Sequence, residues 1–225
     1  IAALLAVLVI GLINGLLVVY CNITDFIVTM GTLYVAGGIR YFLVEGYSLS
    51  LSTLPDFPLY QIFQNRYAGM PIYFWFTIGL VVLVTILNKR TVLGRNILIA
   101  GDSREVARLA GINVSRVRVI AYLLSALFSG IAGIFLSISV GLGLPETGDG
   151  WEFRAIAGAV VGGTSLFGGK SSPLGTFLGV MLMFVAENAI IFIGLPGTMR
   201  VAVQGILMAV AVFIDILRQK RKIEA

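Results

Sequence analysis

Few residues of this chain can carry out covalent or metal chemistry. The 225 residues contain no histidine and a single cysteine, Cys21. A His/Cys metal site, an internal disulfide and a Ser-His-Asp mechanism are therefore excluded. The sequence also lacks a GxxxxGK[ST] phosphate-binding loop, so the chain is not expected to hydrolyse a nucleotide. We expect a protein that is not an enzyme and that uses no metal or cofactor.

The most informative spacing lies in the run GDSREVARLAGINVSRVRV. It predicts a short helix over residues 103–110. Asp102 is the expected N-cap, with Glu105 three positions later as in a capping box. Gly111 supplies the left-handed position that ends the helix.

This short helix has two different faces. Val106, Leu109 and Ala110 lie on one face, whereas Arg104 and Arg108, spaced i to i+4, lie on another. A capped amphipathic helix of this kind is suited to docking into the groove of a partner protein. The alternative is a solvated loop whose positive charge only orients the chain.

The composition indicates what must position this helix. The residues AVILMFWYC make up 58% of the chain and charged residues only 12%, about half the share of a soluble protein. This composition is typical of a membrane protein. The net charge of +5 then marks cytoplasmic loops rather than a nucleic-acid surface.

A membrane-spanning helix needs about 20 mostly apolar residues. Arg40 and Glu187 lie within candidate spans, so those helices are expected to face protein or water rather than lipid. Asn113 or Ser115 can cap the helix that enters the membrane at Val119. The six candidate spans are residues 1–20, 26–44, 71–88, 119–145, 173–194 and 199–217.

Basic residues orient these spans. Residues 89–118 contain seven Lys or Arg against two acidic residues, and the tail after Ile214 contains four against two. Because Lys and Arg concentrate in cytoplasmic loops, both segments are expected in the cytoplasm, with the loops around 45–70 and 145–153 outside.

Residues 155–169, AIAGAVVGGTSLFGG, are uncharged but short and rich in glycine. They are either a short crossing or a re-entrant element. An odd number of crossings must separate the cytoplasmic residue 118 from the cytoplasmic tail, which favours a full crossing with Lys170 at its cytoplasmic end. We also expect tight helix packing at three GxxxG spacings: Gly11 and Gly15, Gly158 and Gly162, Gly175 and Gly179.

Several long runs of the chain resemble one family. They are TVLGRNILIAGDSREVARLAGINVSRVRVIAYLLSALFSGIAGI, AIAGAVVGGTSLFGGKSSPLGTFLG with a following helix that contains Asn188, and the opening GLINGLLVVYCNITDFIVTMGTL. Together they closely resemble the membrane permease subunits of bacterial ribose-type sugar ABC importers. The resemblance covers about residues 11–215.

The resemblance implies an all-α, polytopic transmembrane bundle of around ten helices in the bacterial plasma membrane, paired with a second permease subunit as a homodimer or heterodimer. It also implies a soluble sugar-binding protein outside and two ATPase subunits in the cytoplasm. On this view residues 1–225 are one transmembrane domain that begins inside a helix, a fragment without its N-terminal helices. Residues 89–118 form the cytoplasmic coupling loop, and the residues expected to couple it to the ATPase are Arg104, Glu105, Val106, Arg108, Leu109 and Gly111.

A pathway for an uncharged sugar needs neutral hydrogen-bonding groups. Four side chains in apolar helices could supply such groups. For each of them, the alternative to a role in the pathway is a structural hydrogen bond between helices, worth about 1 kcal/mol. Glu187 has either a pathway role, a pairing with Arg200 or Arg40, or a place near the headgroups. The neutral candidates are Asn14, Thr29, Asn188 and Gln204.

Two other functions remain open from the sequence. One is a related ABC permease for branched-chain amino acids, for which a zwitterionic substrate would favour ionisable groups such as Glu187 and Arg40 in the pathway. The other is a channel with VVGGTSLFGGK as its filter, although the TVGYG pattern is absent. The sequence does not say which sugar is carried or whether the dimer is symmetric.

Overall fold

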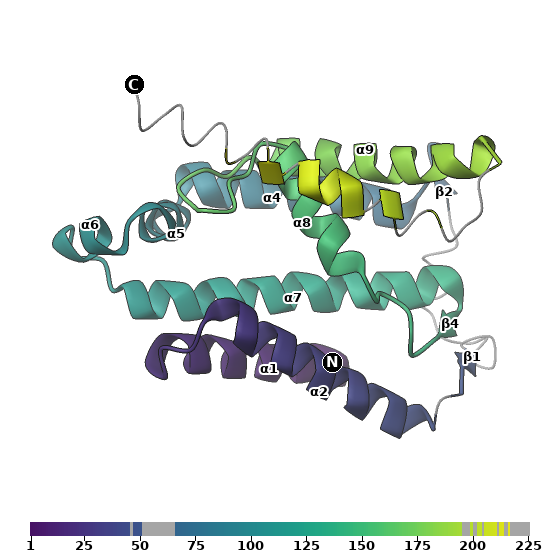
Figure 1. Ribbon diagram of the computed structural model, residues 1–225, viewed down its shortest axis with the longest axis horizontal. Helices are drawn as coiled ribbons and strands as arrows, with labels where there is room; N and C mark the ends of the chain where they lie inside the picture. Colours follow the sequence, from purple (N-terminus) through teal and green to yellow (C-terminus); the bar gives the residue numbers. More distant parts are fainter. Residues whose placement is uncertain are drawn as a thin grey trace. The chain divides into compact units, whose positions relative to one another are not determined.

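The computed structural model describes residues 1–45, 47–50 and 66–194, together with residues 199, 202–203, 205–210, 212–213 and 216. The described chain is mainly helical, as predicted (Figure 1). Its main helices are α1 (Ala2–Tyr20), α2 (Asp25–Val44), α4 (Ile72–Arg90), α5 (Val92–Asp102), α6 (Arg104–Leu109), α7 (Val114–Val140), α8 (Trp151–Val161) and α9 (Pro173–Phe192).

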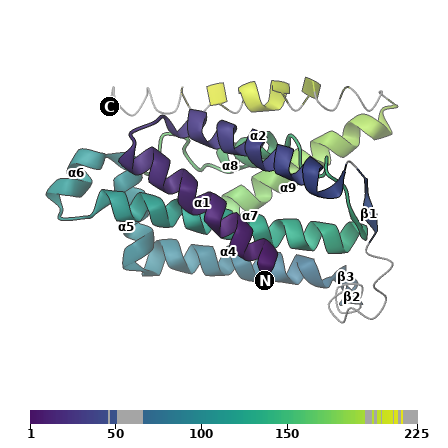
Figure 2. The same ribbon diagram turned by 90° about the horizontal axis from the view of Figure 1, so that it is seen from below.

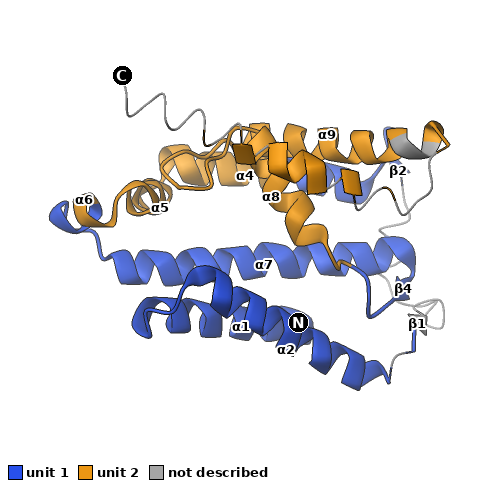
Figure 3. Ribbon diagram, viewed as in Figure 1, with its two compact units in different colours: residues 1–78, 107–147 blue, residues 79–106, 148–225 orange. Residues whose placement is uncertain are grey.

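Short antiparallel pairs of strands accompany the helices. β1 (Leu49–Ser50) pairs with β4 (Leu142–Gly143), and β2 (Arg66–Tyr67) pairs with β3 (Met70–Pro71). The first pair joins the segment after α2 to the end of α7. The helices fall into two compact units, residues 1–78 with 107–147 and residues 79–106 with 148–225, which Figure 3 colours separately.

In the first unit α1 packs along α7 and also contacts α2 (Figure 2). Glycines permit the close approach of α1 to α7. A Cβ at Gly11 would lie 2.5 Å from the Ala126 Cβ, and one at Gly15 would lie 3.3 Å from the Val119 Cα. The predicted packing at this GxxxG spacing is therefore confirmed.

In the second unit α8 and α9 form an antiparallel hairpin whose two GxxxG spacings face each other. A Cβ at Gly162 would overlap the Gly175 carbonyl oxygen, and one at Gly179 would overlap the Gly158 carbonyl oxygen. Without side chains at these positions, the two backbones approach closely and gain van der Waals contact along the hairpin. Both GxxxG predictions are confirmed here.

Four of the described helices are long and apolar enough to cross a membrane: α1, α2, α4 and α7. They match the expected spans 1–20, 26–44, 71–88 and 119–145, although α7 begins earlier, at Val114. α9 forms over most of the expected span 173–194. Within the expected span 199–217, the described residues 199, 202–203, 205–210, 212–213 and 216 are all helical.

Residues 155–169 are not one continuous helix, and their full crossing of the membrane stays a prediction. α8 has 11 residues and ends at Val161, so it is about 16 Å long, roughly half the hydrocarbon thickness. The chain then turns through Gly163, Gly168 and Gly169, all with positive φ, before α9 begins. These left-handed positions stop the helix, and the apolar length of the sequence did not reveal them.

The glycine packing of the hairpin can be tested with one added methyl group. Gly162→Ala is expected to destabilise the protein by about 1–3 kcal/mol, because the backbone of Gly175 must move. Thermal unfolding in detergent measures this effect. The matched control is Gly133→Ala on α7, where a Cβ would meet no described atom within 4 Å. Equal unfolding temperatures for the two variants would contradict the packing.

Candidate coupling site and pathway residues

The basic loop begins with a tight corner between α4 and α5. The Thr91 hydroxyl oxygen accepts a hydrogen bond from the Gly94 N–H (3.1 Å) and donates one to the Leu87 carbonyl (2.6 Å). A Cβ at Gly94 would overlap that carbonyl, so the corner requires glycine. α5 was not predicted, because residues 92–102 were considered only for their charge.

α6 is the helix predicted in this loop, with a different cap. The Ser103 hydroxyl accepts a hydrogen bond from the Val106 N–H (3.3 Å). Asp102 is the last residue of α5, so its backbone is already helical and it does not cap α6. The predicted Asp102 N-cap and its capping box with Glu105 are therefore wrong.

The predicted end of α6 is confirmed. Gly111 has φ +77°, its N–H donates to the Arg108 carbonyl (3.0 Å), and the Ile112 N–H donates to the Ala107 carbonyl (2.9 Å). The Asn113 side chain then accepts from the Arg116 N–H (3.0 Å) and caps α7. α6 and α7 are thus joined by four residues, three of which take part in these hydrogen bonds.

Both predicted faces of α6 are exposed. The buried residue of the helix is Ala107, which was assigned to neither face. Val106 is 57% exposed and Leu109 is 83% exposed, beside the exposed side chains of Arg104 and Arg108. An open apolar face on a short, well-capped helix is what a docking element needs.

The glycine-rich turn between α8 and α9 lies against α5. A Cβ at Gly168 would overlap the Gly101 carbonyl, and one at Gly169 would overlap the Asp102 carboxylate. The Asn88 side-chain amide also donates to the Ser171 hydroxyl (2.9 Å). These contacts place the turn, including Lys170, beside the basic loop and give the glycines a packing role.

Glu187 is the buried ionisable group of the second unit. It is 6% exposed, and the Arg154 Nε lies 3.0 Å from its Oε1. This oxygen makes no hydrogen bond within the described part of the chain, so the contact is an ion pair without good hydrogen-bond geometry. The Arg154 guanidinium also lies 5.6 Å from the centre of the Trp151 ring. The partner of Glu187 in the described structure is therefore Arg154 in place of the predicted Arg40, and the other predicted partner, Arg200, lies outside the described residues.

The neutral pathway candidates differ in their hydrogen bonding. The Thr29 hydroxyl donates to the Asp25 carbonyl (2.9 Å) and the Asn188 amide to the Phe184 carbonyl (2.8 Å), each on its own helix. The Asn14 Oδ1 is buried without a hydrogen-bond partner among the described residues. Gln204 lies outside the described residues.

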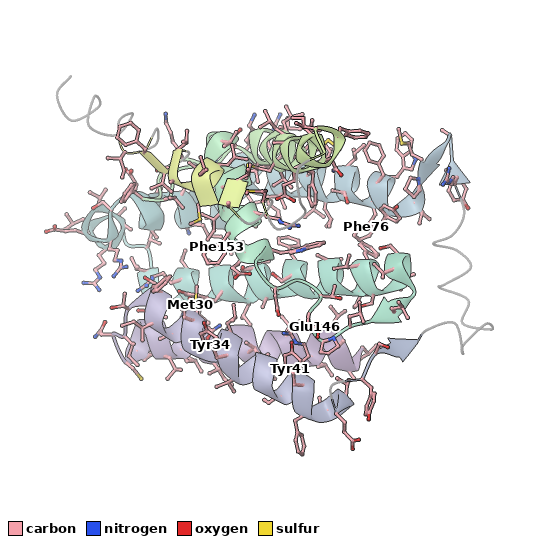
Figure 4. All side chains as sticks on the ribbon, turned by 45° about the vertical axis from the view of Figure 1, so that its right-hand side comes forward. Met30, Tyr34, Tyr41, Phe76, Glu146 and Phe153 are labelled. Atoms are coloured by element: carbon pink, nitrogen blue, oxygen red, sulfur yellow. The ribbon has the colours of Figure 1, made fainter. Side chains whose placement is uncertain are left out.

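Other polar groups were missed by the sequence analysis. Tyr34 and Tyr41 lie along one side of α2 with Met30, labelled in Figure 4, and are 75% and 40% exposed. Their phenol hydroxyls are further neutral hydrogen-bonding groups on α2, where the Thr29 hydroxyl is bonded to a carbonyl of its own helix. The sequence signal that could have found them is their spacing of seven residues, which places both on one face of a helix.

Asp25 and Arg118 form a second missed feature. The Asp25 carboxylate accepts hydrogen bonds from Arg118 (2.8 Å) and from the Tyr122 hydroxyl (2.6 Å). The sequence analysis counted Arg118 only as an orienting charge.

Within the described residues, no three His, Cys, Asp or Glu side chains gather into a potential metal site.

The Arg154–Glu187 pair gives a prediction for stability. Arg154→Ala leaves a buried carboxylate without its partner and is expected to destabilise the protein by about 3 kcal/mol. The double variant Arg154→Ala/Glu187→Leu removes the unpaired charge and is expected to be more stable than Arg154→Ala. Thermal unfolding of both variants and of Glu187→Leu checks this, and additive losses would show that the two side chains do not interact.

Comparison with known proteins identifies the family. A family model described as the permease component of the branched-chain amino acid transport system matches residues 1–212. The chain is 31% identical to the L-arabinose transport system permease protein AraH of Escherichia coli, over 93% of this chain and 63% of that protein. No solved structure matches the chain.

Two further relatives have similar coverage. The chain is 36% identical to the probable ABC transporter permease protein y4mJ of Sinorhizobium fredii (96% of this chain, 64% of that protein) and 31% identical to the ribose import permease protein RbsC of Bacillus subtilis (90% and 62%). The chain therefore spans a little less than two thirds of the curated relatives it matches. With four described helices able to cross a membrane and this match over most of its length, the chain is a multi-pass membrane protein that belongs to the branched-chain amino acid transport system permease family.

Proposed function

We propose that this chain is the transmembrane permease subunit of an ATP-binding cassette importer and forms part of the translocation pathway for a monosaccharide such as ribose. The observation that carries the proposal is α6, a capped helix with an exposed apolar face in the basic loop that joins two long apolar helices. A separate ATPase subunit, docked on α6, hydrolyses the ATP.

A sugar is the substrate class that the observations favour. AraH and RbsC are named for L-arabinose and ribose, although the family description names branched-chain amino acids. A zwitterionic amino acid would need ionisable groups free to bind it. Glu187, the buried acid, is already paired with Arg154, which supports an uncharged substrate. Asn14 and the hydroxyls of Tyr34 and Tyr41 are the neutral groups that we assign to the pathway.

The proposed assembly lies in the bacterial plasma membrane. Two permease subunits pair there, with ATPase subunits bound to α6 in the cytoplasm and a sugar-binding protein on the outer side. The C-terminus is cytoplasmic. The excess of Lys and Arg in residues 89–118 supports this orientation.

The local geometry of α6 suits the transmission of movement. Arg104, Glu105, Val106, Arg108 and Leu109 form the surface that meets the ATPase, and Gly111 provides the sharp end of the helix. Ser103 alone separates α6 from α5, and four residues separate it from α7. When the ATPase subunits close, displacement of α6 is therefore passed to both neighbouring helices.

The orientation has a direct test. In a Cys21→Ser background, Ser103→Cys is expected to resist membrane-impermeant thiol reagents in intact cells, because it lies in the proposed cytoplasmic loop. Glu146→Cys, at an exposed position in the proposed outer loop, is expected to label. Labelling of Ser103→Cys in intact cells would overturn the orientation.

The coupling role has a separate test. Leu109→Asp puts a charge into the proposed contact, and its desolvation costs several kcal/mol, enough to release the ATPase or uncouple hydrolysis from transport. The side chain is 83% exposed, so the chain itself is expected to fold normally. Leu109→Met keeps the contact apolar and is the matched control. The permease is reconstituted with its ATPase and binding protein, and uptake of radiolabelled ribose and L-arabinose is measured. Full ATP-driven uptake by Leu109→Asp would refute the role of α6.

A further inference from the structure

We propose that Asp25, Arg118 and Tyr122 form a latch that makes α2 move with α7 when α6 is displaced. The three side chains are positioning residues for transport, outside both the docking face of α6 and the neutral pathway candidates. The proposal rests on the proposed coupling role of α6.

The latch is made by one carboxylate oxygen. The Asp25 Oδ1 accepts from the Arg118 Nη2 at 2.8 Å and from the Tyr122 hydroxyl at 2.6 Å. Both distances are typical of charge-assisted hydrogen bonds. Arg118 and Tyr122 lie one helical turn apart on α7, so the two bonds attach Asp25 to a single strip of that helix.

The position of the latch links it to α6. Asp25 is the first residue of α2, and Arg118 lies in the second turn of α7, five residues after its cap, Asn113. Between α6 and that cap, the Gly111 and Ile112 N–H groups are bonded to the end of α6. Few torsion angles in residues 110–113 remain free to absorb a displacement. Arg118 is therefore expected to move together with α6.

The remaining packing explains why a latch is needed. α7 packs along α1 through Gly11 and Gly15, and α2 packs on α1 more than on α7. The bonds of Asp25 therefore give α2 a direct attachment to α7. Without them, the described connections of α2 to α7 are its packing on α1 and the β1–β4 pair, which lies beyond the opposite end of α2.

The exposure of the pair separates this role from one in folding. The Asp25 side chain is 52% exposed and the Arg118 side chain is 19% exposed. Because its carboxylate is half exposed to solvent, this pair is expected to add little to stability. Variants at these positions are therefore expected to fold and to bind the ATPase, and their defect is expected in the amount of sugar transported for each ATP hydrolysed.

The experiment compares neutralised, exchanged and control variants in proteoliposomes that contain the permease, its ATPase and its binding protein. Asp25→Asn and Arg118→Gln break the pair, and Asp25→Arg/Arg118→Asp exchanges the charges. Arg116→Gln is the matched control, because it removes the same charge from an exposed position two residues earlier on α7. ATPase binding, ATP hydrolysis and uptake of radiolabelled ribose and L-arabinose are measured for each variant.

Both single variants are expected to bind the ATPase and hydrolyse ATP, while sugar uptake per ATP falls by at least about threefold, the size of effect that coupling between contacting side chains produces. The exchanged variant is expected to recover most of the loss, and Arg116→Gln to match the wild type. Unchanged uptake per ATP in the single variants, an equal loss in Arg116→Gln, or no recovery on exchange would each overturn the latch. Failure of the coupling role itself is recognised separately, by full transport in Leu109→Asp.

Discussion

The free N–H groups at the starts of three consecutive helices are the constraint on which the proposed coupling site depends. Each helix start leaves backbone donors without partners inside the helix. Thr91, Ser103 and Asn113 each accept one of these donors, for α5, α6 and α7. Because the caps are so close together in sequence, the corners between the helices are short and α6 is held out as a small projecting element. Its exposed apolar side chains follow from that geometry.

Glycine shapes the two units in a second way. In the first unit it brings α1 against α7, and in the second it brings α8 against α9 and the turn after α8 against α5. The last contact is the least expected. It joins the glycine-rich run, for which the sequence left a filter role open, to the helix that precedes α6. In the proposed mechanism, displacement of α6 is passed to the α8–α9 hairpin through α5 and to α2 through Asp25.

The sequence predicts the parts of this structure that depend on local pattern. Apolar length located the spans that became α1, α2, α4 and α7, and Gly111 marked the end of α6. Errors arose where tertiary context decides. The Asp102 cap failed because α5 extends through that residue. The partner of Glu187 was missed because the sequence analysis did not pair α8 with α9, and it is this hairpin that brings Arg154 close.

The central claim is that α6 docks on an ATPase subunit, and amide hydrogen exchange tests it most directly. Exchange is compared for the permease in nanodiscs with and without the nucleotide-free ATPase. Burial of Val106 and Leu109 is expected to slow exchange across residues 104–111 when the ATPase is bound, while residues 144–150 exchange as before. Unchanged exchange across residues 104–111 in a complex that has formed would contradict the claim.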